Sequence, residues 1–237
     1  MKKLLLKPML GIFLILVFLF ISCGKVVTKY DAFPQMYEEK PVSILVLPPI
    51  NESTAADAKE YYATTVAEPL SLTGYYVFPI EVVTEVLNSE GLYDTEILNE
   101  LAIPKFKEYF GADAVLFIRI LNWDTSYYVL GGSVKVKVAY KLVSTTTSET
   151  LWKYEGEKKI DTSGDSGGAG GLAGLLVKAI TTAAKTAATD YVPLAKKANF
   201  QALVSIPYGK YHPQFNKDKD TKVVKEKLAK TEEVEKK

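Results

Sequence analysis

The sequence contains a single cysteine and a single histidine among its 237 residues. One cysteine excludes an intramolecular disulfide, so the folded part of the chain must be stabilised by its hydrophobic core. The histidine, His212, has no second histidine with which to share a metal ion, and this ligand count argues against a zinc site. The formal net charge of +1 gives no electrostatic basis for binding nucleic acid.

The chain also lacks an apolar run as long as a membrane-spanning helix requires. The run from Met9 to Ile21 is shorter than the about 20 residues of such a helix and fits the about 7–15 residues of a secretory signal. Lys2, Lys3 and Lys7 precede it and form a positive n-region. We therefore predict that residues 1–22 are a signal peptide; an uncleaved signal anchor is the alternative.

Cys23 follows this run directly, after the small residue Ser22. The arrangement resembles a lipobox, in which the cysteine thiol accepts a diacylglyceryl group and becomes the first residue of the mature chain, although Phe20 replaces the usual aliphatic residue. Two or three acyl chains anchor a protein stably where one chain would not. We predict lipid attachment at Cys23. Gly24 stands where an aspartate favours inner-membrane retention in many Gram-negative bacteria, which predicts the outer membrane and a periplasmic location.

The hydrophobic pattern of the remaining chain predicts one α/β domain. The continuous apolar run Val42–Leu47 is typical of a strand buried on both faces. In Ser133–Val143, apolar residues alternate with mostly polar ones, as in a strand with one face exposed to solvent. Further strands are predicted at residues 75–78, 114–121 and 150–158. Helices are predicted at residues 55–72, 80–90, 94–110 and 172–191. Residues 198–206 fit either a helix or a strand. Strands and helices alternate first, and three strands joined by short turns follow, so we expect a mixed β-sheet packed against helices.

Composition divides the mature chain into three parts. Residues 23–41 are mostly polar and are predicted to be a lipidated tether, residues 42–216 the α/β lipoprotein domain, and residues 217–237 a charged flexible tail. Some side chains of the tether could dock on the domain, namely Tyr30, Phe33, Met36 and Tyr37.

Two motifs imitate catalytic or cofactor sites. Gly164–Gly168 spells the sequence around a protease nucleophile, Ser166, but His212 follows the serine instead of preceding it as in chymotrypsin-like proteases. Gly168–Ala173 imitates a dinucleotide fingerprint with Asp190 downstream, but a long polar loop stands where a strand must precede it. We therefore expect no catalytic, cofactor-binding or metal-binding residues, no small-molecule substrate and no enzymatic activity.

Several stretches together resemble a family of bacterial lipoproteins of unknown function. They are Ser43–Ser53, Gly74–Pro79, Phe110–Ala114, Thr125–Tyr127 and Tyr208–Pro213. The resemblance implies a fold similar to the TolB N-terminal domain, shared with the curli-secretion lipoprotein CsgG and the penicillin-binding-protein activator LpoB. It also implies other envelope lipoproteins as partners and a role at the outer envelope.

The leading interpretation is a non-enzymatic lipoprotein that binds or helps to assemble other envelope proteins, with the membrane as a partner through Cys23. Self-association into a homo-oligomer stays open. The alternative is a subunit of a secretion pore similar to CsgG. Ser133–Val143 has the about 9–11 alternating residues of a membrane strand, with its valines toward lipid and its lysines toward a lumen.

Overall fold

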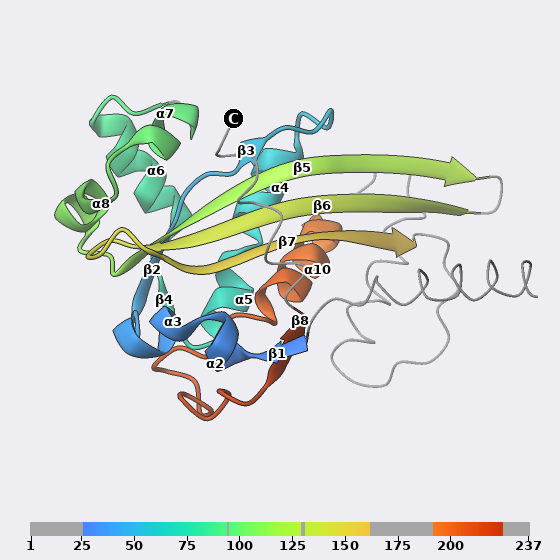
Figure 1. Cartoon of the computed structure of the whole chain (residues 1–237). Helices are drawn as coiled ribbons and strands as arrows, with labels where there is room; N and C mark the ends of the chain where they lie inside the picture. Colours follow the sequence, from blue (N-terminus) through green and yellow to red (C-terminus); the bar gives the residue numbers. More distant parts are fainter. Residues whose placement is uncertain (1–25, 94, 129–130, 162–191, 225–237) are drawn as a thin grey trace, which may run out of the picture.

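The structure, a computed structural model, describes residues 26–93, 95–128, 131–161 and 192–224. Its centre is a six-stranded mixed sheet with the order β4-β2-β5-β6-β7, in which β3 pairs with β5 outside this path (Figure 1). The strands of this sheet are β2 Ser43–Val46, β3 Ile50–Asn51, β4 Tyr76–Val77, β5 Ala114–Tyr128, β6 Gly131–Ser144 and β7 Thr150–Asp161. A separate two-stranded sheet joins β1 Val26–Thr28 to β8 Lys222–Val224.

The sheet combines a parallel half with an antiparallel half. β2 lies parallel to both β4 and β5, and helices connect these strands, as parallel pairing requires. β5, β6 and β7 form an antiparallel meander whose strands extend well beyond the helical layers (Figure 1). The helices are α2 Lys29–Ala32, α3 Pro34–Glu39, α4 Ala58–Thr64, α5 Ala67–Leu72, α6 Ile80–Ser89, α7 Thr95–Glu100, α8 Ile103–Phe110 and α10 Val192–Leu203. This arrangement confirms the predicted α/β domain with a mixed sheet.

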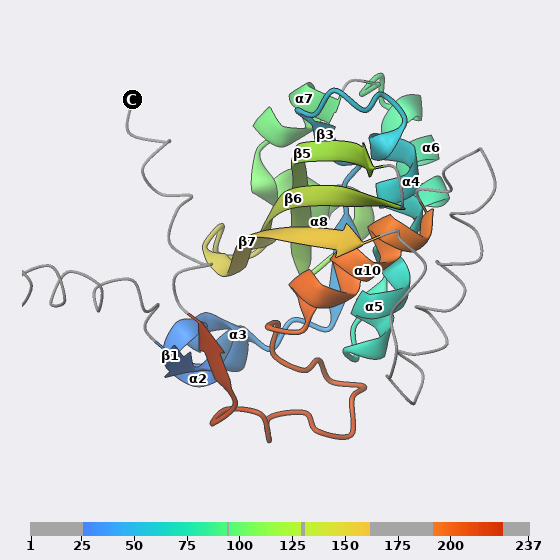
Figure 2. The same cartoon turned by 90° about the vertical axis from the view of Figure 1, so that its right-hand side faces the viewer.

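Each face of the sheet has its own hydrophobic core. Ile44 and Val46 point into a large core that includes side chains of α4, α5 and α10, and these three helices lie together beside the strands in Figure 2. Leu45 and Leu47 point the other way, into a smaller core with α6, α7 and α8. Successive side chains of a strand alternate between faces, so a strand covered on both sides needs a continuous apolar sequence. The prediction for this segment is confirmed.

Prolines begin helices here instead of ending them. The helix predicted at residues 55–72 is divided into α4 and α5 after Thr64, and Pro69 lies in the first turn of α5. The helix predicted at 94–110 is divided between Glu100 and Ile103, and Pro104 lies in the first turn of α8. Each break lies just before its proline, because a first-turn residue donates no intrahelical hydrogen bond and proline is tolerated there.

The meander strands are longer than the sequence pattern predicts. β5 continues past Leu121 to Tyr128, where the sequence becomes polar. A Gly-Gly pair is typical of a turn, and the sequence predicts one at Gly131 and Gly132. These residues instead pair with Tyr128 and Tyr127 within the sheet, so the prediction is wrong at these two positions. The segment 198–206, which fitted either structure, is largely helical in α10.

The two ends of the described chain are folded together on the domain. Phe33 and Met36, in the predicted tether, are buried in the large core. Val223, in the predicted tail, packs against the same core. Figure 2 shows β1, β8 and α2 side by side at the edge of the molecule. The folded unit therefore extends beyond residues 42–216 on both sides.

Candidate functional site

Most of the residues singled out in the sequence lie outside the described part of the chain. These are Cys23, Ser166, the glycine-rich segment 164–173 and Asp190, as well as the helix predicted at 172–191. His212 is described, and its ring stacks on Tyr208 with 3.7 Å between ring centroids. Its Nδ1 atom accepts a hydrogen bond from the backbone N–H of Gln214 at 3.0 Å. The histidine therefore has structural contacts of its own within a turn.

A group of charged and aromatic side chains joins the N-terminal helices to the C-terminal segment; we call Lys29, Tyr37, Tyr208 and Asp218 the terminal latch. The Lys29 ammonium donates hydrogen bonds to the Ile206 carbonyl at 2.8 Å and to Asp218 Oδ2 at 3.2 Å. Asp218 also accepts hydrogen bonds from the Tyr37 hydroxyl at 3.1 Å and from the Tyr208 backbone N–H at 3.0 Å. Both oxygens of its carboxylate are thus engaged.

The charged pair of the terminal latch, Lys29 and Asp218, is almost completely removed from solvent. The side chains of Lys29 and Asp218 are each 3% exposed. Burial lowers the pKa of Lys29, and the charge of Asp218 and its hydrogen bond oppose this change. The Lys29 ammonium also lies 4.7 Å from the centroid of the Tyr208 ring, in a cation–π arrangement. A buried ion pair of this kind is costly to break because the remaining partner stays charged and unpaired.

Two glycines bring the latch to the sheet. Gly74 has a φ of +92°, and a Cβ atom there would lie 2.5 Å from the backbone nitrogen of His212. A Cβ atom at Gly209 would collide with the Gly74 carbonyl. Backbone hydrogen bonds run from Gly209 to Thr73 and from Tyr211 to Gly74. The stretches 74–79 and 208–213, which carry part of the family resemblance, therefore pack against each other, and only glycine fits at their contact.

Another stretch of the resemblance fixes the first strand of the sheet. Asp113 lies just before β5, and its Oδ2 atom accepts hydrogen bonds from the backbone N–H groups of Val42 and Ser43 at 3.0 and 3.1 Å. The Ser43 hydroxyl donates to the same oxygen at 3.1 Å. Asp113 thus aligns the beginnings of β2 and β5, which explains its place in the motif without a chemical reaction.

A buried polar network connects three elements inside the large core. The hydroxyls of Tyr62 on α4 and Tyr140 on β6 lie 2.5 Å apart. Tyr140 donates to Asn199 Oδ1 on α10 at 2.6 Å, and Asn199 Nδ2 donates to the Thr65 hydroxyl at 2.9 Å. Burial raises the pKa values of both tyrosines. The network holds α4 and α10 against the sheet.

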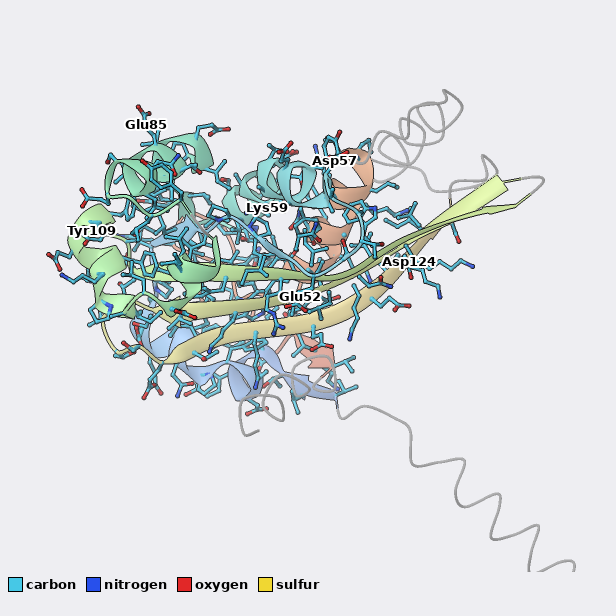
Figure 3. All side chains as sticks on the ribbon, turned by 90° about the horizontal axis from the view of Figure 1, so that it is seen from above. Glu52, Asp57, Lys59, Glu85, Tyr109 and Asp124 are labelled. Carbon is cyan, nitrogen blue, oxygen red and sulfur yellow. The ribbon has the colours of Figure 1, made fainter. Side chains whose placement is uncertain are left out.

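The opposite face of the meander is polar where the helices α6 to α8 do not cover it. Arg119 Nε donates to Glu52 Oε1 at 2.7 Å, and Lys137 pairs with Glu155 at 2.8 Å. Figure 3 shows Glu52 and Asp124 along these strands, and the Asp124 carboxylate accepts from Asn122 at 2.8 Å. We call the surface formed by Glu52, Arg119, Asn122, Asp124, Lys137 and Glu155 the open sheet face.

The valines of β6 are not available to lipid in this arrangement. Val134, Val136 and Val138 are buried in the large core under the helices of the domain. The lysines of β6 lie on the other face, as the alternation predicted. The use of Ser133–Val143 as a membrane strand, on which the pore alternative depended, therefore has no support.

Neither a metal cluster nor a membrane helix is found among the residues that the structure describes. No group of three or more His, Cys, Asp and Glu side chains is arranged there to hold a metal ion. Within the same ranges, no helix combines the length and the apolar character needed to cross a membrane.

Sequence reasoning missed Lys29 and Asp218, the central residues of the terminal latch. Both lie in polar stretches, and a lysine or aspartate there is expected to be solvated. A weak signal was present, since β-branched residues occur at both ends of the described chain, in Val26–Thr28 and at Val223 and Val224. Such runs favour strands, but nothing in one sequence indicates that they pair with each other.

The comparisons with known proteins agree on a lipoprotein family. The family described as "Putative lipoprotein GNA1162-like" matches residues 30–209. A protein of Neisseria meningitidis serogroup B, "Putative lipoprotein NMB1124/NMB1162", is 33% identical over 153 residues, which cover 65% of this chain and 70% of that protein.

A solved structure of the family shows the same fold. The crystal structure of lipoprotein GNA1162 from Neisseria meningitidis is similar with a TM-score of 0.50 and 34% identity, over 60% of this chain and 96% of that one. The NMR structure of LpoB from E. coli is more distant, with a TM-score of 0.38 and 15% identity over 59% of this chain and 72% of that one. A likeness at that level carries no functional argument.

Proposed function

The chain belongs to the GNA1162-like lipoprotein family, and from this membership we propose that it is a lipoprotein of the outer membrane that faces the periplasm and binds other envelope proteins without catalysing a reaction. The anchor is a diacylglyceryl group on Cys23. Membership supports an envelope lipoprotein directly; the membrane, its face, the binding role and the absence of catalysis are the proposal.

The observation that carries the proposal is the fixed attachment of the N-terminal helices to the domain. β1 begins only three residues after Cys23, and Lys29 is held in the buried terminal latch immediately after β1. A domain that exchanged a diffusible substrate would not need its body coupled to the anchor. A domain that presents a surface to neighbouring envelope proteins benefits from it, because a short connection limits the orientations available at the membrane.

The engagement of the polar side chains supports a binding role. The carboxylate of Asp218, the hydroxyls of Tyr62 and Tyr140, and the ring nitrogen Nδ1 of His212 all have partners within the domain. General acid–base catalysis requires a side chain that can exchange a proton with a substrate. Each of these groups stabilises the fold instead, so the surface is the part of the domain that we expect to act.

Replacement of the anchoring cysteine tests the first part of the proposal. Cys23→Ala should abolish incorporation of radiolabelled palmitate and leave an unprocessed precursor, because no thiol remains to accept the lipid. Ser22→Ala is the matched control, since alanine is also small and should preserve labelling. Equal labelling of Cys23→Ala and wild type would refute the anchor.

A defined complex would test the binding role. Chemical crosslinking in intact cells, followed by purification of the wild-type protein, should yield an envelope protein that co-elutes with it at a fixed ratio. The same protein should be lost from Cys23→Ala, because that variant keeps its signal peptide and does not reach the outer membrane. Purification of the chain alone, with full palmitate labelling, would leave the anchor intact and reject the binding role.

A further inference from the structure

We propose that the exposed face of the β1–β8 sheet is the surface that rests on the lipid bilayer. The inference depends on the proposed anchor at Cys23 and adds an orientation to it. We call this surface the membrane-facing patch; it consists of Val26, Thr28, Lys222 and Val224, with Tyr30 and Lys219 beside it.

The length of chain between the anchor and the domain restricts the distance to the membrane. Two residues separate Cys23 from Val26, the first residue of β1. Three residue steps span at most about 10 Å when fully extended. A lipidated Cys23 lies at the level of the lipid headgroups, so β1 cannot move far from the bilayer, and the domain surface nearest to Val26 must lie against it.

The strand pairing places a second segment at the same level. β8 is antiparallel to β1, and Val224 is the pairing partner of Val26. Directly paired residues of antiparallel strands have Cα atoms about 4.5–5.5 Å apart, and their side chains share a face. Val224 is therefore held as close to the membrane as Val26, although it stands at the other end of the described chain.

The exposed face of this small sheet is apolar where it lies nearest to the anchor. Val26 and Val224 are 53% and 43% exposed. Val27 and Val223 point to the other side, and Val223 packs against the large core. In the domain itself these two paired valines remain about half exposed to water. Insertion among lipid headgroups would remove both from water.

The residues around the valines suit an interface between water and lipid. Tyr30 is 44% exposed, and the Lys219 ammonium lies 5.4 Å from the centroid of its ring. Tyrosine and lysine combine an apolar body with a polar end and favour membrane interfaces. Asp31 and Asp220 are exposed nearby and offset the lysine charges. The contact therefore depends on apolar insertion more than on anionic lipid.

This orientation directs the rest of the molecule away from the bilayer. In both Figure 1 and Figure 2, α6 and α7 lie on the opposite side of the molecule from β1 and β8. Glu85 on α6 points into solvent in Figure 3. The exposed surfaces of these helices would then be open to the periplasm and accessible to partner proteins.

Fluorescence quenching can measure the orientation of the full lipidated protein. A dye is attached to Lys222→Cys, on the membrane-facing patch, or to Glu85→Cys, on the far side. Each protein is reconstituted in vesicles of phosphatidylethanolamine and phosphatidylcholine that carry a nitroxide on the lipid headgroup. The acylated Cys23 does not react with the dye, which unsubstituted protein would verify. We expect quenching at position 222 to exceed quenching at position 85 severalfold.

The outcomes separate the orientation from the anchor. Protein that floats with the vesicles but shows equal quenching at the two positions, or more at 85, overturns this inference and leaves the anchor intact. Protein that does not float with the vesicles refutes the anchor, and the inference falls with it.

A matched pair of valine substitutions tests the patch itself. Val224→Asp should reduce the quenching at position 222 severalfold because a charged side chain resists insertion. Val204→Asp, at a valine that is 75% exposed after α10, should leave it unchanged. Both positions are exposed, so both variants should fold. Equal quenching in the two variants would mean that the short connection alone sets the orientation, and would overturn the role of the patch.

Discussion

The terminal latch and the open sheet face contain the same chemistry in opposite surroundings. Lys29 and Asp218 are each 3% exposed, whereas Arg119 and Glu52 are 44% and 39% exposed. In the buried pair, Lys29 also donates a hydrogen bond to a backbone carbonyl. Asp218 also accepts hydrogen bonds from a tyrosine hydroxyl and a backbone N–H. The exposed pair competes with water and salt. Ion pairing alone therefore does not indicate where a chain depends on its charges; burial and the surrounding hydrogen bonds do.

The two regions also differ in what they connect. Arg119 and Glu52 join β5 to the loop after β3, which already pairs with β5. The terminal latch joins the helices near the anchor to the last described segment, beside the β1–β8 pairing and the backbone hydrogen bonds from Lys29 to Thr221 and from Tyr30 to Lys219. Loss of the latch should therefore weaken the attachment of both ends of the described chain, while loss of the exposed pair should leave the sheet unchanged.

The largest effect should follow from removing one partner of the buried pair. Lys29→Met leaves the Asp218 carboxylate buried and without its counter-ion, which we expect to lower the free energy of unfolding by about 3–5 kcal/mol. Chemical denaturation measures this change, and Lys217→Met, at an exposed lysine, is the control. A double variant, Lys29→Met with Asp218→Leu, should be less destabilised than Lys29→Met alone. A loss of under about 1 kcal/mol for Lys29→Met would mean that the buried pair stabilises the fold no more than the exposed pair of Arg119 and Glu52 does.

The glycine contact that supports the latch should come next. Gly74→Ala forces an L-residue into a left-handed conformation, at about 1–2 kcal/mol, and adds a collision with His212 at about 1–3 kcal/mol. Gly91→Ala is a matched control, because Gly91 has a φ of +79° but nothing within 4 Å of the added Cβ atom. Thermal melts should show a larger loss for Gly74→Ala. Equal losses would mean that only the backbone conformation matters and that segment 208–213 can move aside.

The buried tyrosine network should give an intermediate effect with a distinct pH dependence. Tyr140→Phe removes the hydrogen-bond partner of Asn199 Oδ1 and of the Tyr62 hydroxyl and should cost about 1–3 kcal/mol at neutral pH. Burial raises the pKa values of Tyr62 and Tyr140 above their ordinary value of 10.0. In the unfolded chain these hydroxyls ionise above about pH 10, whereas in the folded protein they stay protonated to higher pH. Their contribution to the free energy of unfolding is therefore fully present below about pH 10 and is lost as the pH rises further. Each tyrosine accounts for about 1.4 kcal/mol per pH unit in that range.

Urea denaturation between neutral pH and pH 11 checks this slope. The fall in stability above pH 10 should be shallower in Tyr140→Phe than in wild type, since one titrating group is removed. An identical slope in both proteins would show that Tyr140 does not resist ionisation in the folded state.

The smallest effect should come from the open sheet face. Arg119→Ala should change the free energy of unfolding by no more than about 1 kcal/mol, and the change should shrink at high salt because the charges are screened. Glu52→Gln is the paired variant, and its effect should be similar. A loss as large as that of Lys29→Met would contradict the distinction between the two regions.

The sequence predicts those elements of the fold whose burial leaves a regular pattern of apolar residues. The apolar run at Val42–Leu47 and the alternation at Ser133–Val143 correspond to β2 and β6, because burial on two faces and on one face leave different patterns. The segments 55–72 and 94–110 read as single helices in the hydrophobic pattern, but each is divided just before a proline that lies in the first turn of the next helix, Pro69 or Pro104.

The terminal latch could not be predicted because it depends on contacts between distant residues. Lys29 and Asp218 each stand in a stretch that is typical of solvated chain. Their burial depends on partners that come from three separate segments, including the Ile206 carbonyl and the Tyr208 backbone. The pattern that predicts lipid attachment at Cys23 is, by contrast, local to a few neighbouring residues, and the described structure begins after it.

The latch also fixes an order of events during synthesis and export. Its two charged residues are 189 positions apart in the chain, so the contact cannot form until nearly all of the chain has emerged. A chain is made from its N-terminus, and long-range contacts form late because they close a large loop. Lys29 and Tyr37 must therefore wait for Asp218, and β1 must wait for β8. If Cys23 is acylated as the chain leaves the inner membrane, the protein is attached to lipid before its two ends close, and the final step of folding takes place on the membrane surface.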